Sequence, residues 1–161
     1  PVCGRVTPLG DSVCWSCSVN KIPFKSHRSV YFYRDKARGS VTRFKFRNKP
    51  HYAETMGQLM SVYAPGRSSV DCVTYVPMTK RAVKKRGYNQ ACLLAERIAE
   101  IIGVECEPVL EKTRETGVQS RLGFKKRQRN IKGAFAASGN VKGKNILLVD
   151  DDKVYDCKKL L

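Results

Sequence analysis

The segment at residues 144–151 constrains the fold more than any other part of this chain. Four consecutive apolar residues, at positions 146–149, run directly into Asp150 and Asp151. A strand that is apolar at successive positions is buried on both faces, which is typical of parallel sheets covered by helices. The segment therefore predicts a central strand whose carboxyl end presents acidic side chains.

Strand and helix patterns alternate along much of the remaining chain. Asn89 is a suitable N-cap for an amphipathic helix that Gly103 closes. Strands separated by helices indicate an α/β fold with a doubly wound parallel sheet. Further strands are expected at 29–33, 71–77, 104–109 and 133–136, helices at 35–47, 51–63 and 153–161, and loops at 78–87 and 112–132.

The chain is strongly basic, with 31 Lys and Arg against 14 Asp and Glu, a net charge of +17. Such an excess favours a polyanionic partner, either nucleic acid, a phosphorylated metabolite or acidic lipid. A generically basic, soluble surface is the alternative. No apolar run exceeds five residues, whereas a membrane span needs about 20, so we expect no span.

Seven cysteines occur in the chain, and the first ten residues contain no apolar stretch typical of a signal peptide. We therefore expect a reducing, cytoplasmic compartment without a disulfide framework.

The cysteines at the beginning of the chain predict a structural zinc ion. Residues 1–25 are rich in loop-forming residues and cannot bury a core of their own. Cys14 and Cys17 form a C-x2-C knuckle, and Cys3 resembles the second half of another. Zinc would bind these three thiolates, and the fourth ligand would be a cysteine just before Pro1 or His27. Three unpaired thiols are the alternative.

Two predicted strand ends carry unusual chemistry. Five bases and no acid occupy positions 80–86, after the strand at 71–77, and the other strand ends in Asp150 and Asp151. Ligands bind beyond the carboxyl ends of parallel strands. Bases suit phosphates, and a carboxylate pair suits vicinal hydroxyls or a divalent ion. Together they predict a sugar-phosphate site, although an acidic strand end alone can be a solvated turn.

Residues 34–49 place Phe44 and Phe46 among seven basic residues. A site for single-stranded nucleic acid combines a cationic groove with aromatic side chains on which bases stack. Core packing is the alternative for both rings. The predicted nucleic-acid-binding residues are Arg43, Phe44, Lys45 and Arg47.

Short motifs follow one another in a recognisable order. They are C-x-x-C at 14–17, Arg-Phe-Lys-Phe at 43–46, Val-Pro-Met at 76–78, Lys-Arg-Gly-Tyr-Asn-Gln at 85–90, Lys-Thr-Arg at 112–114 with Gln119, Arg-x-x-Asn at 127–130 with Gly-Ala-Phe at 133–135, and Leu-Leu-Val-Asp-Asp at 147–151. Over essentially the whole chain this order resembles the ComF family of competence-associated, phosphoribosyltransferase-like proteins.

The resemblance implies a type I phosphoribosyltransferase-like parallel sheet with flanking helices (26–161, with a lead-in at 26–68 and the sheet core at 69–161), preceded by a small zinc knuckle (1–25). It also implies a site for phosphoribosyl pyrophosphate (PRPP), in which the acid pair binds the ribose hydroxyls and Mg²⁺ is held largely by the pyrophosphate. The implied PRPP-binding residues are Val76, Pro77, Arg86, Arg114, Arg127, Asp150 and Asp151.

The function that the resemblance implies is handling of single-stranded DNA during natural competence, with PRPP as a bound ligand and a DNA-uptake helicase as a candidate partner. The alternative is an active phosphoribosyltransferase, a glycosyltransferase in which Asp150 and Asp151 would be catalytic and the acceptor is an unidentified base or amine. No obvious general base supports that alternative, since His27 and His51 lie outside the predicted sheet core.

The chain departs from the family pattern after the acid pair. The family motif continues with a Thr-Thr-Gly-type loop that cradles a 5′-phosphate at a helix N-terminus. Here Asp151 is followed directly by Asp152 and Lys153. We interpret this junction as an omitted mobile segment, because such loops are where disorder concentrates. A real deletion would remove the cradle and disfavour transferase chemistry.

Overall fold

The computed structural model describes residues 13–19, 24–30, 35–116, 123–151 and 153–157. The helices are α1 (Trp15–Val19), α2 (Asp35–Phe46), α3 (Tyr52–Ser61), α4 (Lys80–Arg86), α5 (Gln90–Ile102) and α6 (Phe124–Ile131), with a 3-10 turn, η2 (Arg67–Ser69). The strands are β1 (Ser26–Ser29), β2 (Cys72–Tyr75), β3 (Glu105–Cys106), β4 (Leu110–Lys112), β5 (Phe135–Ala137), β6 (Ile146–Asp150) and β7 (Lys153–Cys157). None of the helices in these ranges has the length and apolarity that a membrane crossing needs.

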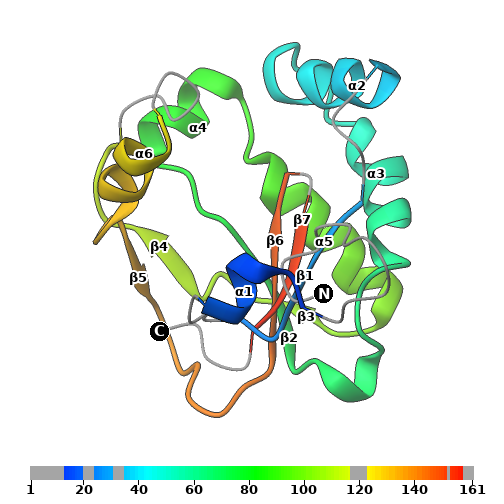
Figure 1. Cartoon of the computed structure of the whole chain (residues 1–161). Coiled ribbons are helices and arrows are strands. Elements are labelled where there is room, and N and C mark those ends of the chain that lie inside the picture. The colour runs from blue at the N-terminus through cyan, green and yellow to red at the C-terminus, as the bar shows by residue number, and fades with distance from the viewer. Residues whose placement is uncertain (1–12, 20–23, 31–34, 117–122, 152, 158–161) are drawn as a thin grey trace.

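A five-stranded sheet in the order β1-β7-β6-β2-β3 forms the centre of the molecule (Figure 1). Strands β6, β2 and β3 are parallel, whereas β7 and β1 continue the sheet in antiparallel pairing. The remaining strands, β4 and β5, form a separate antiparallel ribbon. The predicted α/β fold with a parallel sheet and flanking helices is therefore confirmed, with β2 and β6 at its centre.

Helix α5 carries the core between the sheet and α3. Its apolar face is buried, with Leu94 and Ile98 fully enclosed, as the helical spacing predicts. The Asn89 side chain caps the first turn by accepting from the Ala91 N–H, and Gly103 ends the helix with a φ of 71°. Glycine adopts this left-handed conformation without the steric cost of a side chain.

Two segments that we expected to be loops contain helices. Residues 80–86 form α4, because the Thr79 hydroxyl accepts from the Ala82 N–H and Gly87 ends the helix with a φ of 92°. Residues 112–132 include the end of β4 and all of α6. The strand expected at 104–109 is limited to β3, and the one expected at 29–33 lies earlier, as β1, with residues 31–33 outside the described ranges.

The expected helix at 153–161 is wrong for residues 153–157, which form β7. Strand β7 pairs with β6 along its whole length, from Asp150 opposite Lys153 to Ile146 opposite Cys157. Without this partner, the backbone groups on one side of the buried β6 would be unpaired, which is costly in a core. Sheet pairing therefore overrides the local helical pattern.

The same pairing spans the junction after the acid pair. Asp150 and Lys153 are direct partners, and the sequence is continuous between them. The interpretation of an omitted segment is not tested by this pairing and stays a prediction. In the sequence as given, β7 follows the acid pair where the family pattern has a phosphate loop.

Candidate functional site

The two strand ends that the sequence marks as unusual lie at one edge of the sheet. Strands β2 and β6 are parallel neighbours, with Tyr75 opposite Val149. The Val76 N–H donates to the Val149 carbonyl at 3.0 Å, so the pairing extends one residue past β2. The basic segment after β2 and the acids after β6 therefore start from adjacent positions.

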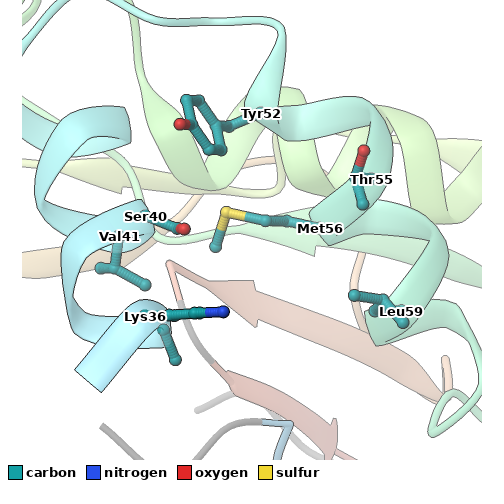
Figure 2. Close-up of a pocket in the computed structure, with 8 residues that line it drawn as sticks. Lys36, Ser40, Val41, Tyr52, Thr55, Met56 and Leu59 are labelled. Atoms are coloured by element: carbon teal, nitrogen blue, oxygen red, sulfur yellow. The ribbon is translucent and has the colours of Figure 1, made fainter. Parts of the chain in front are cut away.

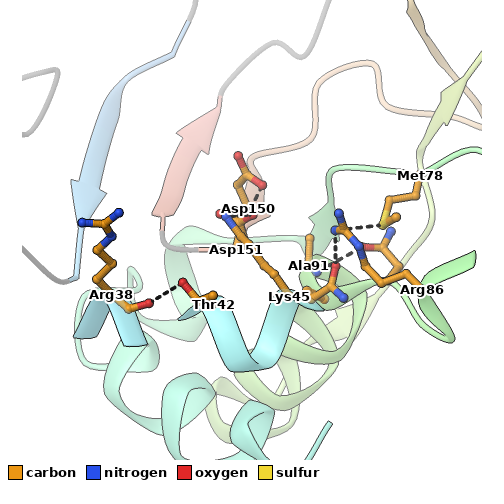
Figure 3. A network of polar contacts seen from close by, with 10 residues as sticks. Arg38, Thr42, Lys45, Met78, Arg86, Ala91, Asp150 and Asp151 are labelled. Carbon is orange, nitrogen blue, oxygen red and sulfur yellow. Dashed lines mark hydrogen bonds and ion pairs between the residues drawn. The ribbon is translucent and has the colours of Figure 1, made fainter. Parts of the chain in front are cut away.

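The acid pair is tied to helix α2. Lys45 Nζ lies 2.5 Å from Asp151 Oδ2, and these side chains are 22% and 24% exposed. The Asp151 N–H donates to Asp150 Oδ1 at 2.8 Å. Figure 3 shows Lys45 reaching from α2 to the end of β6. A residue predicted for nucleic acid thus meets residues predicted for PRPP.

The end of β2 is fixed by Asn89. Its amide nitrogen donates to the Val76 carbonyl at 3.1 Å, while its oxygen caps α5. Both backbone polar groups of Val76 are thereby used within the fold. Val76 and Pro77 lie in the connection from β2 to α4. The polar side chains that could contact a ligand come from α4, namely Lys85 and Arg86.

A pocket of about 480 Å³ lies between the end of α2 and α4. We refer to it as the α2–α4 pocket. Three cations line it and no acid does, while Met78 and Ala82 provide apolar surface. Its lining residues are Lys45, Phe46, Asn48, Met78, Ala82, Lys85 and Arg86. This composition suits an anionic ligand that also carries an apolar or aromatic group.

Arg86 is held in place on the wall of this pocket. One of its terminal nitrogens donates to Gln90 Oε1 at 2.8 Å and lies 3.9 Å from the Met78 sulfur (Figure 3). Its guanidinium carbon lies over the Phe46 ring, 5.2 Å from the centroid, which is within the range of a cation–π contact. The predicted phosphate-binding arginine is therefore oriented before any ligand arrives.

The two phenylalanines of α2 have opposite environments. Phe44 is fully buried, its ring packs 5.7 Å from that of Tyr88, and its carbonyl accepts from the Tyr88 hydroxyl. A ring without exposed surface cannot stack on a base, so the prediction of Phe44 as a nucleic-acid contact is wrong and its core-packing alternative holds. Phe46 is 69% exposed. Two residues along a helix are about 200° apart, which places the rings on opposite faces.

Arginines of α2 and Arg47, which directly follows the helix, line a second, open pocket of about 500 Å³, the arginine pocket. Its lining residues are Arg38, Gly39, Thr42, Arg43 and Arg47. Arg43 donates from Nε to the Tyr52 hydroxyl at 3.1 Å, and the arginines are exposed. The predicted residues Arg43 and Arg47 are thus brought together, and Arg38 joins them. Arg38 could have been predicted as well, because it lies in the same basic helix as Arg43.

Arg114 binds elsewhere than at the acid pair. Arg114 donates to the carbonyls of Asn130 and Lys132 at 2.9 and 2.8 Å, so it binds the end of α6. In Figure 1 the β4–β5 ribbon lies apart from the five-stranded sheet. Arg127 belongs to α6, but its side chain is outside the described part of the structure.

The cysteine knuckle has a geometry that fits two corners of a zinc site. The sulfur atoms of Cys14 and Cys17 lie 3.5 Å apart, across the turn that starts α1. Two thiolates on one tetrahedral zinc ion would be about 3.8 Å apart, given Zn–S bonds of about 2.3 Å. Cys3 is outside the described residues, and among those described no three His, Cys, Asp or Glu side chains gather into a metal site.

A smaller apolar pocket of about 250 Å³ lies between α2 and α3. Figure 2 shows Met56 pointing from α3 toward Ser40 and Val41 of α2. Lys36 is its one charged lining residue, and neither acid of the strand end reaches it. Of the residues that the sequence predicts for ligand binding, Lys45 and Arg86 line the α2–α4 pocket, and Asp151 is tied to it through Lys45.

Cys92 of α5 and Cys106 of β3 are poorly suited to act as nucleophiles. Burial raises the pKa of Cys106 to about 12 and that of Cys92 to about 11. A raised pKa lowers the fraction of thiolate at neutral pH, and the thiolate is the reactive form.

Comparison with known proteins gives three informative relatives. The chain is 27% identical over 158 residues to the DNA utilization protein YhgH of Salmonella typhimurium, covering 94% of this chain and 70% of that protein. It is 30% identical over 164 residues to the competence protein ComFC of Bacillus subtilis, covering 94% and 64%. Competence protein F of Haemophilus influenzae is 25% identical over 121 residues, covering 69% and 53%. No family model matches.

Among solved structures, the chain is similar to the glutamine PRPP amidotransferase of B. subtilis complexed with ADP and GMP. The TM-score is 0.42 at 20% identity. The match covers 69% of this chain and 24% of that enzyme, so the chain spans about a quarter of it.

Proposed function

Since the chain belongs to the ComF family, together with competence and DNA utilization proteins, we propose that it handles single-stranded DNA and holds PRPP, or a related sugar phosphate, at the ends of β2 and β6. The observation that carries this proposal is the Lys45–Asp151 ion pair, which joins the basic surface of α2 to the acid pair. The proposal places the protein in the cytoplasm, where a helicase of DNA uptake is a candidate partner.

The arginine pocket supports the DNA part of the proposal. Three exposed arginines, two in α2 and Arg47 directly after it, border one open surface. Arginine donors match phosphate oxygens in a fork geometry, so a row of them suits a phosphodiester backbone. Lys45 and Arg86 extend the same charge toward α4. The positive charge thus lines two pockets beside α2 rather than a single one, as expected of a site for more than one phosphate.

The acid pair supports the sugar-phosphate part. Asp150 and Asp151 would accept from ribose hydroxyls, with Arg86 as a partner for the pyrophosphate and Mg²⁺ carried mainly by the pyrophosphate itself. Lys45 would have to release Asp151 when the ribose binds. Strand β7 pairs with β6 directly after the acid pair, where the family pattern has a phosphate loop. A chain that truly lacks this loop would have no cradle for a 5′-phosphate there, which would favour binding of PRPP over the transferase alternative.

Replacing Arg38, Arg43 and Arg47 by glutamine should flatten the salt dependence of single-stranded DNA binding. Each phosphate contact to a single strand contributes about 0.7 to the slope of log K against log salt concentration, so the slope should fall by roughly 2. Fluorescence anisotropy with a labelled oligothymidine at several salt concentrations measures it.

A matched control replaces three exposed bases elsewhere, Arg67, Lys132 and Lys142, and should leave the slope closer to that of the unchanged protein. Equal slopes for the two triple variants, together with equal affinity for single and double strands, would leave only a generically basic surface and contradict the DNA proposal.

We also propose that Cys3, Cys14 and Cys17 hold a structural zinc ion. Removing Cys14 and Cys17 together by serine substitution should reduce bound zinc from about one equivalent to less than half, since structural sites bind zinc tightly and lose it with their thiolates. Elemental analysis in reducing buffer measures this. The control Cys92→Ser lies in α5 and should keep its zinc; a full equivalent in the double variant is the contrary result.

A further inference from the structure

The α2–α4 pocket differs from the arginine pocket because an exposed aromatic ring forms part of its wall. We propose that this pocket binds one nucleobase of single-stranded DNA, with Phe46 as the stacking side chain and Lys45 and Lys85 as contacts to the flanking phosphates. The inference rests on the proposed DNA function and adds a base-binding site to it. The site is inferred from the exposed ring and the cations of the pocket taken together.

Exposure of Phe46 is the first argument. A phenylalanine that is 69% exposed gives up the favourable transfer of its ring out of water, which is about 1.5–3 kcal/mol for full burial. Its neighbour Phe44, two residues earlier in the same helix, is fully buried. The ring of Phe46 therefore has free surface in a place surrounded by cations, which is the combination that single-strand sites use.

Preorganisation of Arg86 is the second argument. Its guanidinium is already placed against Phe46 and is held from behind by Gln90, which is 2% exposed. A group held in its binding geometry loses little conformational entropy when the ligand arrives.

Size and composition point to one nucleotide rather than a duplex or a free sugar phosphate. The volume of about 480 Å³ lies within the range of about 300–1,000 Å³ usual for small-ligand pockets. Paired bases are stacked inside a duplex and cannot reach a side-chain ring at the protein surface. PRPP has no base to stack on Phe46, and neither acid of the pair lines this pocket. Cations on both helices would also attract an acidic peptide, and the test below distinguishes that occupant from a nucleobase.

The test is Phe46→Ala in the full chain, measured by fluorescence anisotropy with two oligonucleotides of equal length. One is oligothymidine, and the other carries the same phosphates on abasic sugars. Stacking on one aromatic side chain is worth about 1–3 kcal/mol, so Phe46→Ala should weaken oligothymidine binding by roughly 5- to 150-fold. Binding of the abasic strand and the salt slope should stay unchanged. Phe46→Trp, which keeps an aromatic face, should retain affinity.

Controls keep the result decisive. Thermal unfolding followed by circular dichroism should show that Phe46→Ala is folded, and if it is not, Phe46→Leu carries the same expectation with more bulk. An equal loss for both oligonucleotides, or no loss for either, would overturn the base pocket. In that case the triple arginine variant still reports on the proposed function, because it tests phosphate contacts independently of stacking. Binding of an acidic peptide that Phe46→Ala weakens, with no effect on DNA, would assign the pocket to a protein partner instead.

Discussion

Phe44→Ala should lower the free energy of unfolding by about 3–5 kcal/mol, because it removes a fully buried ring from the centre of the core and leaves a cavity. The ring packs with Val41 of the same helix and with Met60 of α3 in one buried cluster, and it contacts Tyr88. Urea denaturation followed by circular dichroism at 222 nm measures the change, with the midpoint and slope fitted together.

Phe46→Ala is the matched control, since it removes the same side chain from the same helix. Its ring is mostly exposed, so the free energy of unfolding should change by no more than about 0.5 kcal/mol. Similar destabilisation by the two substitutions would mean that α2 does not pack as described. The pair thus separates effects on the fold from effects on binding.

Replacing Asp150 and Asp151 together by asparagine should abolish PRPP binding. Asparagine keeps the size of each side chain but removes the charge that would orient ribose hydroxyls and any bridging cation. Isothermal titration calorimetry with PRPP and Mg²⁺ measures it. Lys45→Met is the control, because it also breaks the ion pair to Asp151 but leaves both carboxylates in place.

The control should bind PRPP at least as well as the unchanged protein, because the ribose no longer competes with Lys45 for Asp151. Equal affinity of the double asparagine variant and the unchanged protein would refute the assignment of the acid pair. Loss of binding in both variants would instead show that α2 needs the ion pair to position the site.

Sequence reasoning succeeds where the signal is local. The cap at Asn89, the apolar stripe of α5 and the stop at Gly103 all lie within 15 residues, and the helix forms between those limits. The apolar run at 146–149 likewise forms β6. A strand covered on both faces is apolar at successive positions, so its own sequence is enough to predict it.

The errors occur where distant partners decide. Residues 153–157 become a strand because β6 requires a neighbour, and that requirement is invisible in their own pattern. The choice between Phe44 and Phe46 depends on which side of α2 meets Tyr88, a residue 44 positions later. For α4 the local signals were present in Thr79 and Gly87, but the density of positive charge suggested a loop.

If both proposed ligands bind, the Lys45–Asp151 ion pair couples the affinities for the sugar phosphate and for DNA. A sugar that takes the Asp151 carboxylate releases Lys45 toward DNA phosphates, and a strand that takes Lys45 leaves the carboxylate open for the sugar. Thermodynamic reciprocity then requires that each ligand raise the affinity for the other by the same factor. One lysine on the last turn of α2 is sufficient for such mutual enhancement, without any rearrangement of the sheet.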